Sequence, residues 1–248
     1  MKKILFTLLL CGFACLSLNA QKPLRKPQKT TQSSNAGNAN SASRPSKPTS
    51  ATPSKRPAKS GSSAPRIVAT GSIRGHDYVD LGLSVKWATC NVGAEKPSDC
   101  GDYFAWGEIS PKSEYTEENS ITYRKDMGDI AGDSRYDAAR ANWGGSWRMP
   151  TKAEIEELVN KCKTRMTTYN GRKGRLVTGP NGNSIFLPAA GWRYGSSQYD
   201  VGEFGRYWSS TPGEGSTEYA YGLYFYAGDF DWTWGSRYRG HSVRPVSE

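Results

Sequence analysis

The sequence predicts an α+β domain in which one or two helices precede mostly antiparallel short strands. One stretch, residues 151–162, has apolar residues at helical spacing behind a capping motif. The rest of the C-terminal half alternates apolar and polar residues in short runs separated by turn sequences. That pattern is typical of antiparallel strands, so the two signals together favour the α+β class.

The first twenty residues have the features of a secretory signal peptide. Two lysines precede an almost wholly apolar run over 4–18, and Ala20 offers a small residue for cleavage. Lipidation at Cys15 is an alternative, although no leucine stands three residues before it. No later apolar run reaches the roughly 18 residues of a transmembrane span. We therefore expect an exported protein, extracellular or periplasmic, or at the cell surface in association with the outer membrane.

Residues 21–74 are predicted to be a disordered, basic linker rich in Pro, Ser, Thr and Lys. Over 21–66 there is no aromatic residue, and Leu24 is the single large apolar one. Such a segment cannot bury enough surface to offset the loss of chain entropy on folding. It serves either as a soluble spacer or as a contact with anionic envelope polymers.

The excess of positive over negative charge lies in this linker and the signal segment. Ten of the 33 lysines and arginines lie in 21–66 and two in the signal segment, so the remainder holds 21 against 23 acidic residues. The folded part thus has a net charge of −2, and specific nucleic-acid binding is not predicted. Three cysteines remain there, Cys90, Cys100 and Cys162, and any one pair of them could form a disulfide.

One domain is predicted over residues 75–248. Residues 78–92 contain two extended runs, 102–108 form an apolar-aromatic strand, and 109–135 are polar and loop-like. A short helix is predicted at 136–142.

The strongest helix prediction covers residues 151–162. Thr151 and Glu154 have the spacing of a capping box, in which each side chain serves a free backbone amide of the first turn. One stripe of the helix is predicted to be buried, formed by Ile155, Leu158, Val159 and Cys162. Glutamates near the helix start are explained by the helix dipole, and a paired-carboxylate catalytic role is the alternative.

Antiparallel strands are predicted after this helix. Asn170-Gly171 is a hairpin turn sequence, and residues 180–183 form a second turn. The predicted strands have the sequences RLVTG, SIFLPAAG, RYWSSTP, YAYGLYFYAG, FDWTW and HSVRPV.

Several segments resemble exported Bacteroidetes proteins of the Fibrobacter succinogenes major paralogous domain family. They are YVDLGLSVKWATCNVGA, GDYFAWGE, ANWGGSWRMPTKAEIEELVNKC, VTGPNGNSIFLPAAGWR, YWSS and SVRPV. The resemblance implies a C-type-lectin-like fold, distantly related to formylglycine-generating enzymes. Those enzymes use cysteines late in the chain, and this sequence has none after Cys162.

The same resemblance extends to variable proteins of diversity-generating retroelements. In such proteins, asparagine codons of a C-terminal segment change at adenines to Tyr, Asp, Ser, Gly, Thr, Arg or His. Residues of these types stand at or near such positions between 222 and 241 here. Trp234 departs from the pattern, because Trp does not arise from an Asn codon by adenine change alone.

A ligand-binding face is predicted in this C-terminal segment. Tyr219, Tyr221, Leu223 and Phe225 alternate as an inward apolar set, and Phe230, Trp232 and Trp234 alternate with polar residues. Tyr and Arg combined with Ser and Gly are also typical of antibody paratopes. Ordinary aromatic strands with a polar outer face are the alternative. The predicted ligand-binding residues are Gly222, Tyr224, Tyr226, Asp229, Asp231, Thr233, Ser236, Tyr238, Arg239 and His241.

Catalytic and metal chemistry has little support in the sequence. Ser209 or Ser210 with His241 could be imagined as a triad, but no Gly-x-Ser-x-Gly elbow accompanies them. A calcium site at Asp229 and Asp231 lacks further oxygen ligands. We therefore expect a non-catalytic surface protein that binds an unknown protein or glycan without a cofactor. An envelope enzyme related to formylglycine generators, or a structural component of a surface assembly, is the alternative.

Overall fold

The computed structural model describes residues 66–248. The predicted signal peptide, the lipidation alternative at Cys15 and most of the predicted linker lie outside these residues. The first strand begins before residue 75, the predicted start of the domain.

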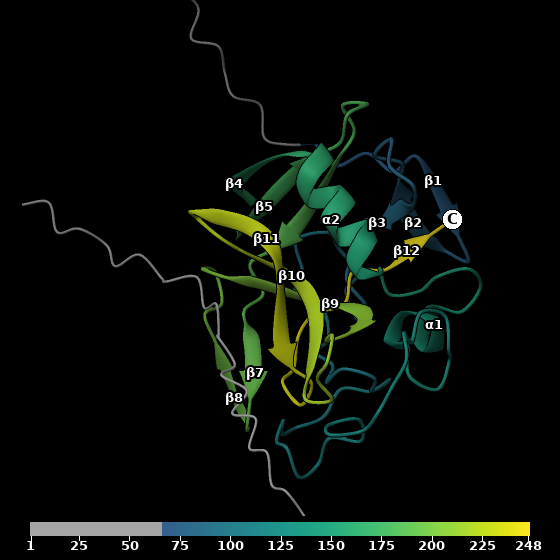
Figure 1. Ribbon diagram of the computed structural model, residues 1–248. Coiled ribbons are helices and arrows are strands. Elements are labelled where there is room, and N and C mark those ends of the chain that lie inside the picture. The colour runs from purple at the N-terminus through teal and green to yellow at the C-terminus, as the bar shows by residue number, and fades with distance from the viewer. Residues whose placement is uncertain (1–65) are drawn as a thin grey trace, which may run out of the picture. The chain divides into compact units, whose positions relative to one another are not determined.

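Two helices and twelve strands occur in the described part of the chain (Figure 1). The helices are α1 (Ala138–Trp143) and α2 (Lys152–Lys161). The strands are β1 (Gly71–Ile73), β2 (His76–Val79), β3 (Lys86–Ala88), β4 (Lys163–Tyr169), β5 (Arg172–Thr178), β6 (Ser184–Pro188), β7 (Trp192–Tyr194), β8 (Ser197–Tyr199), β9 (Gly205–Pro212), β10 (Tyr219–Tyr226), β11 (Asp229–Ser236) and β12 (Val246–Ser247).

The predicted fold class, α+β with a C-type-lectin-like domain, is wrong. Of the described residues, 38% lie in strands and only 9% in helices, so the fold is mostly antiparallel β-sheet. The physical reason is that the helices do not form a layer of their own. Helix α1 has six residues, and α2 fully buries only Ile155 and Leu158. Most core side chains therefore come from strands and from the loops between them.

Four antiparallel sheets build the domain. Their strand orders are β1-β2-β3-β12, β11-β10-β9, β4-β5-β6 and β7-β8. Helix α2 packs against the β9–β11 sheet (Figure 1). The predicted turn at Asn170-Gly171 joins β4 to β5, and both residues have the positive φ angles of a tight hairpin turn.

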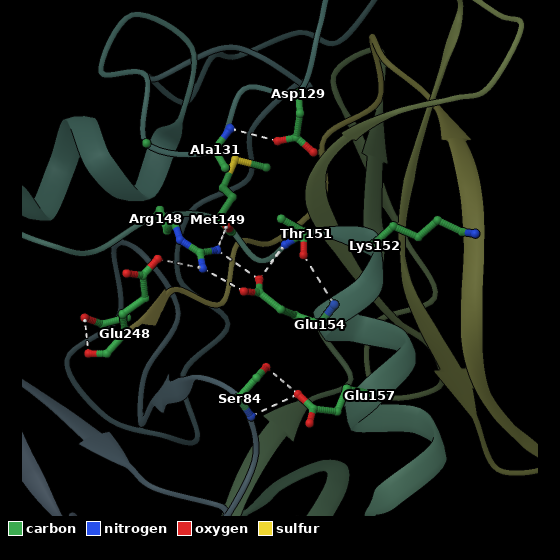
Figure 2. Close-up of polar contacts among 12 residues, drawn as sticks. Ser84, Asp129, Ala131, Arg148, Met149, Thr151, Lys152, Glu154, Glu157 and Glu248 are labelled. Atoms are coloured by element: carbon green, nitrogen blue, oxygen red, sulfur yellow. Dashed lines mark hydrogen bonds and ion pairs between the residues drawn. The ribbon is translucent and has the colours of Figure 1, made fainter.

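Helix α2 begins with the capping box that its sequence predicts. The Thr151 hydroxyl accepts from the backbone N–H of Glu154 at 3.3 Å, and the Glu154 carboxylate accepts from the N–H of Thr151 at 2.8 Å. Glu154 also pairs with Arg148, as Figure 2 shows. One turn further on, Glu157 accepts from the backbone N–H and the hydroxyl of Ser84. These contacts join the helix to the residues directly before it and to the distant segment that precedes β3.

The cap gives a first testable prediction. Replacing Thr151 with alanine should lower the free energy of unfolding by about 1 kcal/mol, because one helix N–H loses its acceptor. Urea unfolding of the purified domain would measure the change. Thr151→Ser is the matched control, since it keeps the hydroxyl and should change little. Equal stability of the alanine variant and the wild type would contradict a stabilising role for the box.

The sequence GDYFAWGE does not form the predicted strand. Phe104 makes an isolated antiparallel bridge with His241, and the Trp106 N–H donates to the carbonyl of Arg237. Gly101 and Gly107 at either end have positive φ angles, which turn the backbone away from an extended path. The aromatic residues are still buried, so burial here comes from a loop rather than from a ladder.

Two fully buried arginines hold the C-terminal segment in place. Arg244 donates to the side chain of Asn91 and to the carbonyls of Ala88, Thr89 and Phe186, at 2.8–3.0 Å. Arg237 donates to four other backbone carbonyls, those of Thr122, Lys125, Ser216 and Tyr219. Both guanidinium groups therefore join the C-terminal segment to buried carbonyl groups of distant segments.

The longest helix among residues 66–248 has ten residues. Accordingly, the described part of the chain contains no helix with the length and apolar character required to span a bilayer.

Candidate functional site

The β10–β11 hairpin carries most of the predicted ligand-binding residues. Its register places Tyr224 opposite Asp231, Tyr226 opposite Asp229 and Gly222 opposite Thr233. Residues directly opposite each other in an antiparallel pair point to the same face of the sheet. Five predicted residues therefore share one face, which we call the hairpin face: Tyr224, Tyr226, Asp229, Asp231 and Thr233.

The opposite face of the hairpin packs on helix α2 and the core. Leu223 and Phe225 are buried in the same cluster as Ile155 and Leu158, which confirms the predicted inward direction of these two residues. Tyr221 is also buried, with the Lys152 ammonium 4.8 Å from its ring centroid. The alternation of β10 therefore separates a packed side from the hairpin face.

The tryptophans of β11 are a correction to the expected core. Trp232 and Trp234 lie on the α2 side of the hairpin but are 37% and 61% exposed. Strand β11 is the outer strand of its sheet, and Lys152 of α2 lies 4.3 Å from the Trp232 ring centroid. Tyr219, at the start of β10, is exposed as well. This side of the hairpin therefore presents an aromatic edge at its outer strand.

Contacts within the hairpin face order its side chains. The Tyr224 hydroxyl donates to the Asp229 carboxylate, and the Tyr226 ring stacks on Phe204 with centroids 5.3 Å apart. Burial, followed by the bond to Asp229, raises the pKa of Tyr224. The phenol is therefore neutral at physiological pH and keeps its proton for that hydrogen bond.

An arginine from a different sheet fixes the turn of the hairpin. Arg175 of β5 donates to the backbone carbonyls of Tyr226 and Asp229, at 2.7 and 2.9 Å. These two residues flank the turn at Ala227-Gly228. The hairpin tip is thus held to the β4–β6 sheet, and the direction of the hairpin face is set by a conformationally restricted turn.

The other predicted site residues do not contribute exposed side chains to the hairpin face. Gly222 is buried, and a Cβ atom there would collide with the carbonyl oxygen of Tyr207, so the glycine is required for strand packing. Tyr238 is buried in the segment after β11, and Ser236 is half-buried at the end of that strand. Arg239 is half-buried over the Trp192 ring, at 4.7 Å from the centroid.

His241 is an interior residue rather than part of an exposed surface. It is 3% exposed and stacks on Trp208 at 3.9 Å between ring centroids. Burial, together with the charges of Arg206 and Arg239, lowers the pKa of His241 well below its usual value. The imidazole is neutral at physiological pH. Ser209, considered with it as a triad member, donates its hydroxyl proton to the Tyr221 carbonyl.

Comparison with known families finds a matching family for most of the folded part. The sequence profile of the Lcl C-terminal domain family matches residues 79–247, about two thirds of the chain. The chain belongs to the Lcl C-terminal domain family. Membership indicates a surface-associated or secreted protein and is consistent with the paralogous family that the sequence resembles. The comparisons with curated proteins and with solved structures found no match.

The described residues offer no cluster of metal ligands. Within residues 66–248, no group of three or more His, Cys, Asp or Glu side chains is placed to hold a metal ion. Asp229 accepts from Tyr224, and Asp231 accepts from the N–H of Trp232. The three described cysteines are free thiols, so none of the candidate disulfide pairs is present.

A pocket of about 430 Å³ lies elsewhere in the described part of the chain, and residues before the matched region contribute to its wall. Residues near β2 and the loop after β3 line it, and His76 stacks on Trp143 in its wall at 3.8 Å. Its carboxylates, Asp77 and Glu95, are exposed. The pocket contains none of the predicted ligand-binding residues. The cavity and the sequence prediction therefore indicate different parts of the molecule as the binding site. The side chains of the hairpin face, unlike these exposed carboxylates, are ordered by mutual contacts.

Sequence reasoning missed the residues that reach this region of the Lcl C-terminal domain from other strands. They are Trp192 of β7, Arg206 of β9, Phe204 before it, and Arg175 of β5. The paired glycines Gly191 and Gly205, joined by a parallel bridge, bring β7 and β9 together. Gly191 directly precedes Trp192, and Gly205 directly precedes Arg206, which was the available signal in the sequence. The sequence does not show that these two glycines pair with each other.

Proposed function

We propose that this protein is a non-catalytic, exported ligand-binding protein whose hairpin face contacts the ligand. The observation that carries the proposal is the separation of roles along β10. Leu223 and Phe225 are fully buried, while their neighbours Tyr224 and Tyr226 lie on the hairpin face and are partly exposed. A surface of this kind can vary in side chain without loss of the core beneath it.

The chemistry of the hairpin face suits recognition of a polar surface. Tyrosines provide large contact area at low entropy cost, and Asp231 and Thr233 provide directed hydrogen bonds. The Tyr224–Asp229 hydrogen bond and the Arg175 contacts restrict the face before binding, which lowers the ordering cost of association. The proposed ligand is a protein or a glycan.

The place of action proposed is the cell surface, in association with the outer membrane, or the extracellular space. The basic linker would contact anionic envelope polymers or act as a spacer there, and this role stays a prediction. Diversification of residues 222–241 by a retroelement also stays a prediction. A neighbouring reverse transcriptase gene and a near-copy of this coding segment would support it, and their absence would contradict it.

The proposal is tested by a triple variant of the hairpin face. Tyr226→Ala, Asp231→Ala and Thr233→Ala together should reduce binding to immobilised glycans, host proteins or whole cells by at least about tenfold, because aromatic and charged anchors carry most interface energy. Stability should change by only about 0.5 kcal/mol for each site, because none of the three side chains belongs to the buried core. Binding is measured on glycan and protein arrays and by adhesion of the labelled protein to cells.

The matched control carries three alanine substitutions on an exposed strand of another sheet, at Lys163, Arg165 and Thr168 of β4. This variant should bind as the wild type does. Wild-type binding by the hairpin-face variant would refute the proposal. Unfolding of that variant would show that the aromatic residues of this face belong to the core.

A further inference from the structure

Two arginines at the base of the hairpin face lack the acceptors that a buried guanidinium normally has. Arg206 lies in β9 and Arg239 follows β11, and both are half-buried. Their buried Nε atoms have no hydrogen-bond partner among residues 66–248. No carboxylate of these residues lies within ion-pair distance of either group.

The neighbouring arginines of the same segment show the contrast. Arg237 and Arg244 are more deeply buried, and four acceptors satisfy each of them. A structural role thus explains those two residues fully. Arg239 stands between them in the sequence, yet it has no such set of acceptors. Buried donors without partners are costly, so a missing acceptor is a physical pointer to a ligand.

The backbone brings Arg206, Arg239 and Trp192 together from three segments. These are β9, the residues after β11, and β7. The parallel bridge between Gly191 and Gly205 places the following residues, Trp192 and Arg206, at neighbouring positions. The segment after β11 then runs alongside both strands. Its Gly240 pairs with β7, and the Ser242 N–H donates to the Arg206 carbonyl at 3.1 Å. Arg239 therefore meets Trp192, whose ring supports its guanidinium.

A third unpartnered nitrogen adjoins the pair. His241, buried against Trp208, has no partner for Nε2 among the described residues. Burial lowers the pKa of Arg206, and the charge of Arg239 lowers it further. The two cations therefore repel each other in a partly dehydrated place. A bound anion would relieve this repulsion and accept from the unpaired donors.

The charges around Arg206 and Arg239 favour a ligand group with one negative charge over a polyanion. Asp200 accepts from the Trp192 indole N–H at 3.0 Å and acts on Arg206 through its charge. Asp229 and Asp231 lie on the adjoining hairpin face. A ligand with many negative charges would be repelled by these three carboxylates, whereas one carboxylate group matches the two arginines.

We propose that Arg206 and Arg239 bind one carboxylate group of a ligand that extends over the hairpin face. Trp192 holds Arg239 in place, and His241 lines the site beside Trp208. The inference rests on the proposed function and adds the chemistry of the ligand to it. The carboxylate belongs either to an acidic sugar or to the C-terminus of a peptide, and both sources share the planar group that a guanidinium fork recognises.

The test follows the Arg Nε–H resonances of the intact secreted protein by NMR during titration. The probes are a methyl glucuronide and an acetylated dipeptide with a free C-terminus. Their neutral counterparts are methyl glucoside and the amidated dipeptide. We expect one of the two acids to shift the Arg206 and Arg239 resonances, and the neutral partner to leave them unchanged. Which acid binds identifies the source of the carboxylate.

Variants of Arg206 and Arg239 then show whether these two arginines bind the acid. Arg239→Gln should weaken binding of the acid at least about tenfold, and Arg239→Lys should weaken it less, because it keeps the charge but not the fork. Arg135→Gln is the control, because Arg135 is exposed and pairs with Asp133 in a loop. A thermal melt of each variant verifies folding, and Arg206→Lys provides a second, conservative change at the other arginine.

Three results would overturn the inference. They are a failure of both acids to bind, equal binding of the acids and their neutral counterparts, and tighter binding of inorganic sulfate than of either acid. If the acids fail but the hairpin-face variant still loses binding on arrays and cells, the carboxylate site is refuted and the proposed function stands. If neither assay detects binding, both are refuted.

Discussion

Replacing Arg244 with leucine is expected to lower the free energy of unfolding by roughly 3–5 kcal/mol. Four buried acceptors, the Asn91 side chain and three backbone carbonyls, would lose their donor. Each unsatisfied buried group costs about 1–3 kcal/mol, and relief from burying a charge offsets part of the sum. Urea unfolding monitored by tryptophan fluorescence would measure the loss.

The control for this substitution is Arg135→Leu. Arg135 is exposed and contacts Asp133 alone among charged partners, so its removal should change stability by no more than about 0.5 kcal/mol. An Arg244 variant that unfolds at the same urea concentration as the wild type would show that the four hydrogen bonds add nothing to stability. The C-terminal sequence SVRPV would then need another structural explanation.

Replacing Phe225 with alanine should cost about 3–5 kcal/mol, the second large effect. The ring is fully buried and packs near Tyr207 and Phe230, with centroids 6.1 and 6.2 Å away. The cavity left behind opens in the main cluster beneath helix α2. Thermal and urea unfolding of the same samples would give the midpoint and the free energy.

The adjacent residue is the matched control. Tyr226 is an aromatic of similar size on the other face of the same strand, and it is 37% exposed. Tyr226→Ala should therefore change stability by about 0.5 kcal/mol. Equal losses at both positions would mean that the two faces of β10 are equally structural, which would remove the basis of a separate recognition surface.

Local signals in the sequence predicted local structure well. The capping box of α2 and the Asn170-Gly171 turn depend on residues three or fewer positions apart, and both are present. The inward direction of Leu223 and Phe225 follows from strand alternation alone. Each of these features is decided by neighbours along the chain, which is why the sequence is sufficient for them.

Features that depend on distant partners were not predicted. The sequence GDYFAWGE has strand composition, but only Phe104 finds a bridge partner, so a loop results. Trp232 alternates as a core residue should, yet it is 37% exposed because β11 is the outer strand of its sheet. The α+β prediction was wrong for the same reason, since a strong helix signal does not reveal how much of the core the helix will bury.

The candidate site was predicted only in part. Tyr224, Tyr226, Asp229, Asp231 and Thr233 lie together because one hairpin carries them. Gly222 and His241 have interior positions that only the packing of Tyr207 and Trp208 reveals. Arg206 and Trp192 come from other strands, and the bridge that joins those strands leaves no periodic pattern in the sequence.

The pairing of β12 with β3 has a consequence for the order of folding. Val246 pairs with Trp87, and its backbone also exchanges two hydrogen bonds with Arg148. The sheet that contains the first strands therefore stays incomplete until residue 246 has left the ribosome. Contacts between such distant residues also make folding slow. Throughout synthesis the growing chain lacks its closing strand, so this sheet is completed only when β12 joins β3.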